Sequence, residues 1–266
     1  MNKVSDQSPE EHLKHEQKQI HLRQLLLCLS SGFLLALAFS THATGWLVWV
    51  ALVPWFYVLY KRPLSLRQTL LYSWFFGMAY YIGSIHWLKE LHPLTWLPGV
   101  SKSTSLMIVY GGILGISLVV SLWPVLLGGL LHVLKPTGYL RILYPVILWM
   151  FMEQAQALGD ISLPWGRLAM SQYQNLWLLQ IIPHTGQLVI AGLIVGFNAS
   201  LLCFLLDFVP DPKPKPYWNY LGFRALMLIA ALISGNLYYG HRVLSSAPEV
   251  EPVGKSDYFV SVVQGN

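Results

Sequence analysis

Glu153 is an acidic side chain that stands well inside an apolar run of this sequence, and Arg167 lies in the polar segment that follows the run. An ionisable group in apolar surroundings is costly, so it marks either a functional site or a hydrogen-bonded anchor. Glu153 therefore has two readings. It is a counter-charge for Arg167 or for a lipid headgroup, or it is a structural hydrogen-bond partner between helices.

Pro164 and Trp165 lie between these two charges, in a segment that we expect to be a loop. Non-helical backbone at membrane depth is tolerated where it is buried in protein or lines a cavity. One prediction is an outer lip beside a lipid-accessible cleft, with Glu153 beneath it, and the alternative is an ordinary tryptophan at the membrane interface. The candidate lipid-binding residues are Glu153, Pro164, Trp165, Arg167, Gln172 and Trp87.

The histidines and cysteines carry no pattern of catalysis or metal binding. His42, His86, His92, His184 and His241 fall on one predicted side without the regular spacing of metal ligands. Cys28 and Cys203 stand in apolar runs, where a thiol is not activated as a nucleophile. We predict no metal site, no cofactor and no catalytic residue within this sequence.

The elements that must hold these residues are membrane helices. The sequence is 55% hydrophobic and 11% charged, with a mean hydropathy of +0.50, whereas soluble domains carry roughly 25% charged residues. A bilayer core needs about 20 apolar residues per helix. We expect about seven transmembrane helices in an all-α polytopic bundle, near Leu25–Phe39, Trp46–Tyr60, Thr69–Leu88, Leu106–Leu134, Ile142–Leu158, Gln187–Leu206 and Leu221–Tyr239.

Three local features refine this picture. The first two runs are short and joined by a turn, so they predict a helical hairpin. The fourth run is long and predicts a tilt or a kink at Pro124. The pairs Gly111/Gly115 and Gly192/Gly196 predict close approaches between helices.

Basic residues set the predicted orientation by the positive-inside rule. With the N-terminus in the cytoplasm, twelve of the 17 Lys and Arg residues fall on the inside and five on the outside. Most of them stand beside apolar runs, where anionic lipid headgroups rather than nucleic acid are the natural partner. This predicts a cytoplasmic N-terminus and an extracytoplasmic C-terminus.

The two ends differ from the apolar middle. We assign 1–24 to a cytoplasmic tail, 25–240 to the transmembrane domain and 241–257 to an extracytoplasmic linker. Residues 258–266 hold a β-branched and aromatic run of strand type. A lone strand is not stable, so we read it as the first strand of an α/β domain whose remainder is absent from this sequence.

In their order and spacing, four features resemble the apolipoprotein N-acyltransferases, the last enzymes of bacterial lipoprotein maturation. They are the first hairpin with Trp46–Pro54, the helix exit at Gly83–Leu88, the Glu153, Pro164-Trp165 and Ser171-Gln172 series, and the terminal Val260–Asn266 strand. The resemblance spans nearly the whole sequence. It departs from the family at Gln156, where members commonly have Arg, and at Arg167, where many have a small or apolar residue.

The resemblance implies an acyl transfer in the bacterial inner membrane. The family holds a Glu-Lys-Cys triad in an extracytoplasmic nitrilase-like domain, beyond the strand that matches 258–266. Its cysteine takes an acyl chain from a phospholipid donor and passes it to the amine of a diacylglyceryl-cysteine on an apolipoprotein. By this resemblance the sequence is the membrane domain of such an enzyme, inactive alone, and its partners are membrane lipids and these two substrates.

Two other functions remain open at this stage. One is a non-catalytic lipid-binding membrane scaffold. The other is a small transporter, although transporters usually show internal repeats with broken helices in matching positions, and this sequence shows no such repeat.

Overall fold

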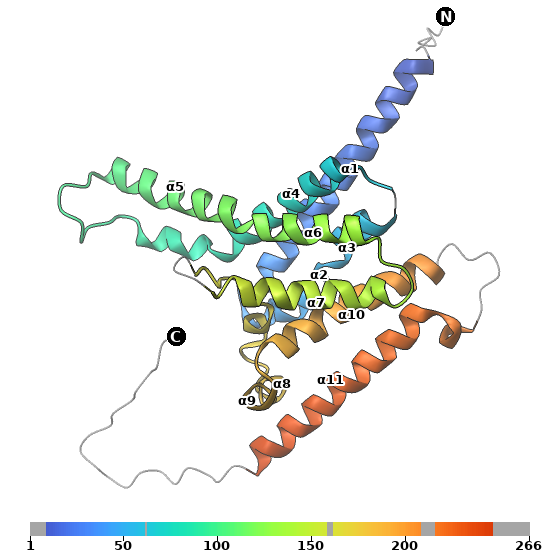
Figure 1. Cartoon of the computed structure of the whole chain (residues 1–266). Helices are drawn as coiled ribbons and strands as arrows, with labels where there is room; N and C mark the ends of the chain where they lie inside the picture. The colour runs from blue at the N-terminus through green and yellow to red at the C-terminus, as the bar shows by residue number, and fades with distance from the viewer. Residues whose placement is uncertain (1–8, 62, 159–161, 209–215, 247–266) are drawn as a thin grey trace, which may run out of the picture.

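The computed structural model of the chain describes residues 9–61, 63–158, 162–208 and 216–246. Within these ranges the chain forms helices and no strand. Figure 1 shows them as α1 (Pro9–Leu37), η1 (His42–Leu47), α2 (Val48–Ala51), α3 (Val53–Lys61), α4 (Leu66–Ser84), η2 (His86–Leu91), α5 (Lys102–Val120), α6 (Leu122–Leu134), α7 (Leu140–Ala155), η3 (Leu168–Gln172), α8 (Leu176–Leu179), α9 (Ile182–Thr185), α10 (Leu188–Phe208), η4 (Tyr217–Asn219) and α11 (Leu221–Ser245).

Five helical segments are long and apolar enough to cross a membrane, which confirms the polytopic helical fold. They are His15–Leu37, Ala43–Lys61, Lys102–Leu134, Leu188–Phe208 and Leu221–Ser245. The other two predicted runs fall on α4 and α7, which pack inside the same bundle. α7 has 16 residues and is shorter than the about 20 that a span requires. The count of seven spans therefore stays a prediction.

Two predicted boundaries fall inside helices. α1 begins at Pro9, so much of the tail assigned to 1–24 is helical. α11 continues to Ser245, into the segment assigned as a linker from residue 241. The rest of that linker and the predicted strand at 258–266 lie outside the described residues.

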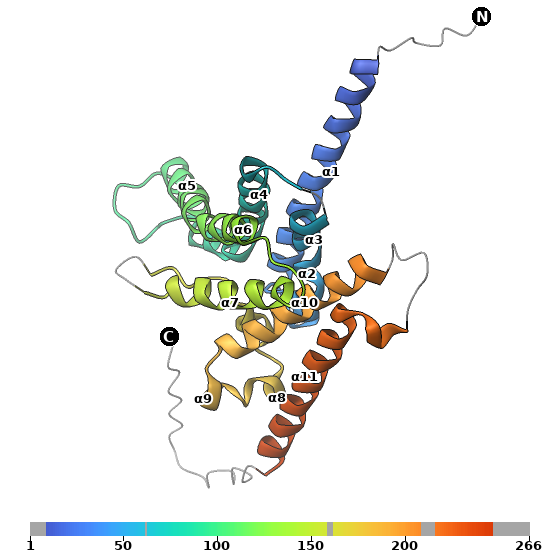
Figure 2. The same cartoon turned by 45° about the vertical axis from the view of Figure 1, so that its right-hand side comes forward.

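The helices pack in a chain of neighbours, with α1 on α4, α4 on α6, α6 on α7, α7 on α10 and α10 on α11 (Figures 1 and 2). The core lies where α3, α4 and α7 meet. There Trp55 stacks on Phe76 with ring centroids 4.2 Å apart, and Trp149 meets Trp55 edge-on at 6.4 Å. All three rings are fully buried, so this aromatic cluster fixes the positions of α4 and α7.

The predicted interruption of the long fourth run is present. The run divides at Ser121 into α5 and α6, three residues before Pro124. Proline lacks the N–H that would bond to the carbonyl of residue 120, and its ring crowds that carbonyl. The 33 residues of Lys102–Leu134 extend about 50 Å at 1.5 Å per residue, against a hydrocarbon core of about 30 Å. Figure 1 shows α5 projecting well beyond the rest of the bundle.

The two glycine pairs behave differently. Gly192 and Gly196 sit on α10 where it meets α7 and α11, and a Cβ on Gly192 would lie 2.9 Å from Met150 Sδ. The prediction for Gly111 and Gly115 is wrong within the described residues, because a Cβ on either one would meet open space. A close approach of α1 to α4 instead uses Gly32, where an added Cβ would overlap the carbonyl oxygen of Phe76.

Asn198 on α10 holds the break between α2 and α3. Its Oδ1 accepts a hydrogen bond from the Leu52 N–H at 3.0 Å, and its Nδ2 donates to the Val48 carbonyl at 3.0 Å. Asn198 is fully buried. It therefore pairs backbone groups that the interrupted helix leaves without helical partners.

Candidate functional site

The candidate site lies at the end of the bundle where α4 and α7 finish, which we call the outer end. Residues 162–173, the docked loop, pack there against the last turns of both helices. Glu153 near the C-terminus of α7 is 1% exposed. Its Oε1 accepts hydrogen bonds from Trp149 Nε1 and from the backbone N–H of Leu168, each at 2.9 Å. One carboxylate oxygen thus joins α7 to the docked loop.

Two tyrosines of α4 bind the docked loop and the end of α7 from the other side. Tyr80 donates its hydroxyl to the carbonyl oxygen of Gly166. Tyr81 accepts a hydrogen bond from Gln156 Nε2 at 2.8 Å, and Gln156 caps α7. Tyr80 is fully buried and Tyr81 is 1% exposed. The Tyr80 hydrogen bond fixes the position along α4 at which the loop crosses the outer end.

Gly166 is required by this arrangement. Its φ is +78°, in the region that favours glycine. A Cβ there would lie 2.7 Å from the Tyr80 hydroxyl oxygen. The loop can therefore reverse direction against α4 only with glycine at this position.

Trp165 and Trp87 meet at the rim of the site. Their ring centroids are 6.2 Å apart at an interplanar angle of 81°, an edge-to-face contact. Trp165 is half-buried against the small cluster of Ile85, Leu94, Val109 and Ile113. Trp87 on η2 is 51% exposed. An apolar surface with a polar indole edge thus faces outward from the docked loop.

Glu153 and Arg167 do not form an ion pair. The structure has no contact between their charged groups within 4.0 Å among the described residues. Glu153 Oε2 and Arg167 Nε are both buried and have no hydrogen-bond partner in the described part of the chain. The structure therefore shows Glu153 as a hydrogen-bond partner that joins α7 to the docked loop. One polar atom of Glu153 and one of Arg167 have no hydrogen-bond partner in the described part of the chain.

Gln172 lies away from the tryptophan pair. Its amide donates to the carbonyl oxygen of Gly45 at 2.9 Å and to Ser171 Oγ at 3.2 Å, and its side chain is 6% exposed. It ties the end of the docked loop to the turn of the first hairpin. The structure thus brings Trp165 and Trp87 together. It buries Glu153 where α7 meets the docked loop, and it places Gln172 in the packing beside the first hairpin.

Tyr80 and Tyr81 are the site residues that the sequence reasoning missed. Adjacent tyrosines near the end of an apolar run are typical of an interfacial aromatic belt, and nothing local distinguishes them from belt residues. Their burial shows only once α7 and the docked loop are in place.

The described residues offer this site neither an exposed thiol nor a metal-binding cluster. Cys28 and Cys203 are fully buried within α1 and α10. The described residues hold no group of three or more His, Cys, Asp or Glu side chains suited to a metal ion. A hollow of about 90 Å³ beside Gln156 and Leu163 has room for roughly three waters at about 30 Å³ each.

The chain matches a known protein family and several of its named members. Residues 31–200 match the family described as "Apolipoprotein N-acyltransferase N-terminal domain". A relative named apolipoprotein N-acyltransferase from Gloeobacter violaceus is 31% identical over 256 residues, which cover 94% of this chain and 44% of the relative. One of the same name from Geobacter metallireducens is 25% identical over 249 residues, covering 92% and 43%. A third, from Thermotoga maritima, is 28% identical over 191 residues, covering 69% and 36%.

The chain spans less than half the length of these relatives. The family match covers 31–200, which includes the end of α1, the hairpin turn, α4, α7 and the whole docked loop. Together with the five apolar helical segments, it identifies a multi-pass membrane protein. This chain belongs to the family of the apolipoprotein N-acyltransferase N-terminal domain.

Proposed function

We propose that this chain is the membrane domain that positions lipid substrates for an apolipoprotein N-acyltransferase. The reaction moves a phospholipid acyl chain to the N-terminal diacylglyceryl-cysteine of a lipoprotein. The observation that carries the proposal is the docked loop. It is fixed by Glu153 and Tyr80 and presents Trp165 at the outer end of a bundle whose family is established.

By the family resemblance, the bond-making groups are a Glu-Lys-Cys triad in a nitrilase-like domain. The cysteine thiolate attacks the ester carbonyl of the phospholipid, a thioester forms and lysophospholipid leaves. The free amine of the acceptor then attacks the thioester, an amide forms and the thiolate returns. Covalent catalysis of this kind divides one difficult transfer into two easier steps. We infer that residues 1–266 alone do not catalyse it, because both of their cysteines are buried among apolar helices.

The contribution of the docked loop is geometric. Acyl transfer between two membrane-bound substrates gains from holding both in a reactive arrangement. The Trp87–Trp165 pair offers an apolar surface for an acyl chain, and an indole N–H can reach a headgroup. Arg167 Nε in the docked loop and Glu153 Oε2 on α7 are buried polar atoms without a hydrogen-bond partner in the described part of the chain. In this proposal they orient the headgroup when the loop shifts to admit a lipid.

The proposed orientation puts the outer end on the extracytoplasmic side of the bacterial inner membrane. It rests on the bias of twelve inside to five outside basic residues, with seven spans and the N-terminus in the cytoplasm. Fusions at Asn266 to an enzyme active only outside the cytoplasm should be active, whereas activity of a cytoplasm-only reporter at Asn266 would overturn the orientation.

The function is tested with a chimera in which residues 1–246 replace the matching membrane segment of the Gloeobacter violaceus relative. Expressed in cells depleted of their own N-acyltransferase, the chimera should restore the third acyl chain on lipoproteins. Mass spectrometry of lipoprotein N-terminal peptides measures this. A chimera that inserts stably in the membrane while lipoproteins keep a free amine would contradict the proposed function.

A further inference from the structure

A second cavity lies at the opposite end of the bundle from the docked loop. It has a volume of about 700 Å³ and opens between α3, the start of α4, the end of α6 and the start of α7. Thr69 on α4 and Arg141 on α7 line the cavity, so they show where it lies along these two helices. Tyr80 and Glu153 stand 11 and 12 residues further along these helices, about 16–18 Å away at 1.5 Å per residue. The cavity is therefore separate from the candidate site.

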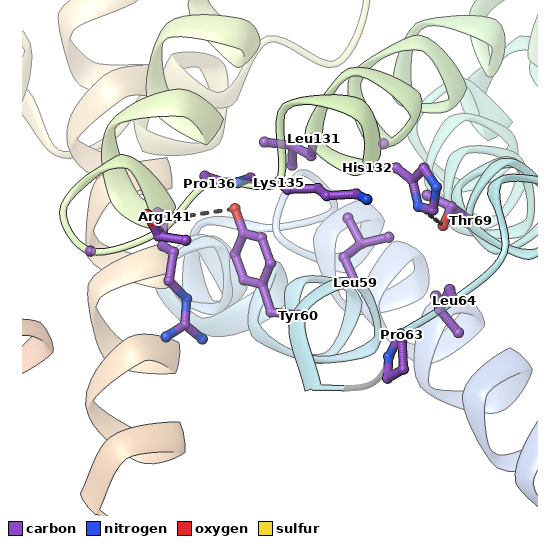
Figure 3. A pocket seen from close by; sticks show the side chains of 13 residues that line it. Leu59, Tyr60, Pro63, Leu64, Thr69, Leu131, His132, Lys135, Pro136 and Arg141 are labelled. Atoms are coloured by element: carbon purple, nitrogen blue, oxygen red, sulfur yellow. Dashed lines mark hydrogen bonds between the residues drawn. The ribbon is translucent and has the colours of Figure 1, made fainter.

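The cavity combines an apolar wall with cationic and hydrogen-bonding groups. Leu59, Leu64 and Leu131 line one part of it. Figure 3 shows the Lys135 side chain reaching across the opening towards His132 and Thr69. His132 Nδ1 lies 3.2 Å from Thr69 Oγ1, and this contact orients the imidazole ring.

Lys135 has no partner that accounts for its charge. The described part of the chain gives its ammonium no ion pair and no hydrogen bond. Arg141 differs, because it extends away from Lys135 (Figure 3), and its Nη1 lies 3.6 Å from Asp207 Oδ1. Lys135 is an exposed side chain, so its ammonium lines the open mouth of the cavity without a protein counter-charge.

The backbone conformation of Lys135 is also unusual for a residue with a side chain. Its φ is 44° and its ψ is 58°, in the left-handed cap position after α6. Glycine occupies this conformation without strain and is the usual residue there. A basic side chain near a helix C-terminus gains from the helix dipole, but that gain does not require the side chain to cross a cavity.

We propose that this cavity binds a phosphate-bearing anion, with Lys135 and His132 on the phosphate. The leucine wall favours an anionic phospholipid of the adjoining leaflet as its source, because acyl carbons can lie along Leu59 and Leu64 while the headgroup reaches the cations. The bound lipid wedges between α3, α6 and α7 at the basic end of the bundle. This role is independent of acyl transfer at the outer end.

The test is a lipid titration of the full 266-residue protein in detergent, read by native mass spectrometry. The probe is phosphatidylglycerol, with phosphatidylcholine as the zwitterionic comparison of zero net charge. Lys135→Gly removes the charge and suits the left-handed backbone, so it should fold at least as well as the parent. We expect it to weaken phosphatidylglycerol binding about fivefold, the effect of one lysine near an anionic surface. His132→Gln should weaken it as well.

Arg67→Gln is the matched control, since Arg67 is exposed at the same end and lies outside the cavity lining. It should leave phosphatidylglycerol binding within about twofold of the parent. Equal losses in Lys135→Gly and Arg67→Gln would overturn the proposal in favour of diffuse surface charge. Competition with inorganic phosphate distinguishes the sources. Displacement of the lipid by millimolar phosphate would assign the cavity to a soluble anion, and retention supports the phospholipid.

Discussion

Replacing Glu153 should release the docked loop in proportion to the hydrogen bonds that are lost. Glu153→Leu removes the acceptor for two buried donors, Leu168 N–H and Trp149 Nε1–H. Leaving a buried donor unpaired costs about 1–3 kcal/mol, so the two together cost about 4 kcal/mol. Glu153→Gln keeps a carbonyl oxygen but makes two charged hydrogen bonds neutral, a loss of about 2 kcal/mol.

Hydrogen exchange of the peptide covering 162–172 measures this directly, because the Leu168 amide exchanges only when the loop leaves α7. Since about 1.4 kcal/mol corresponds to tenfold, exchange should accelerate about thirtyfold in Glu153→Gln and roughly 700-fold in Glu153→Leu. Glu90→Gln is the control. Glu90 is a strongly exposed acid on η2, with Lys89 3.8 Å away, and its loss should leave exchange in 162–172 unchanged.

The reasoning fails if Glu153→Leu folds with unchanged exchange in 162–172, since the carboxylate would then not hold the loop. It fails in a different way if Glu153→Gln and Glu153→Leu accelerate exchange equally. In that case negative charge alone, through attraction to Arg167, would be the stabilising feature.

Three further predictions concern other parts of the chain. Gly166→Ala should lower the free energy of unfolding by about 2 kcal/mol in a thermal melt, through the positive φ and overlap with Tyr80, and Tyr80→Phe should recover part of the loss. Asn198→Leu should cost about 2 kcal/mol in the same assay, because backbone groups of the α2–α3 break lose their partners. Protein of residues 1–266 incubated with phospholipid should carry no acyl group on Cys28 or Cys203 by mass spectrometry. An acylated peptide would show that burial does not silence these thiols.

Much of the fold could be predicted from the sequence because membrane helices depend on local properties. The length of each apolar run fixed where helices form, and Pro124 predicted the break that occurs at Ser121. The extent of the last helix was less predictable. The tail after Tyr239 is polar, but helical hydrogen bonding continues through Gly240, which packs against the Trp177 backbone, to Ser245 without a proline to interrupt it.

The candidate site was predictable only in part because its contacts join distant segments. Glu153 and Trp165 stood out as a charge and an aromatic residue beside an apolar run. Tyr80 gave no such signal, since its role depends on Gly166, 86 residues later. Gln172 is a polar side chain of the kind that can contact a substrate, yet it donates a hydrogen bond to the carbonyl oxygen of Gly45, 127 residues earlier. The Gly111/Gly115 pair shows the same limit, because spacing identifies a smooth helix face without saying whether another helix covers it.

The central claim is that the docked loop positions lipid for acyl transfer, and Trp165→Ala in the chimera tests it most directly. The matched control is Trp96→Ala, since Trp96 is 70% exposed and lies in the loop after η2. At equal amounts of folded chimera, Trp165→Ala should slow the appearance of triacylated lipoprotein at least tenfold, about 1.4 kcal/mol of lost positioning, and Trp96→Ala should leave it unchanged. Unchanged turnover in Trp165→Ala at normal expression would make Trp165 a plain interfacial anchor and contradict the claim.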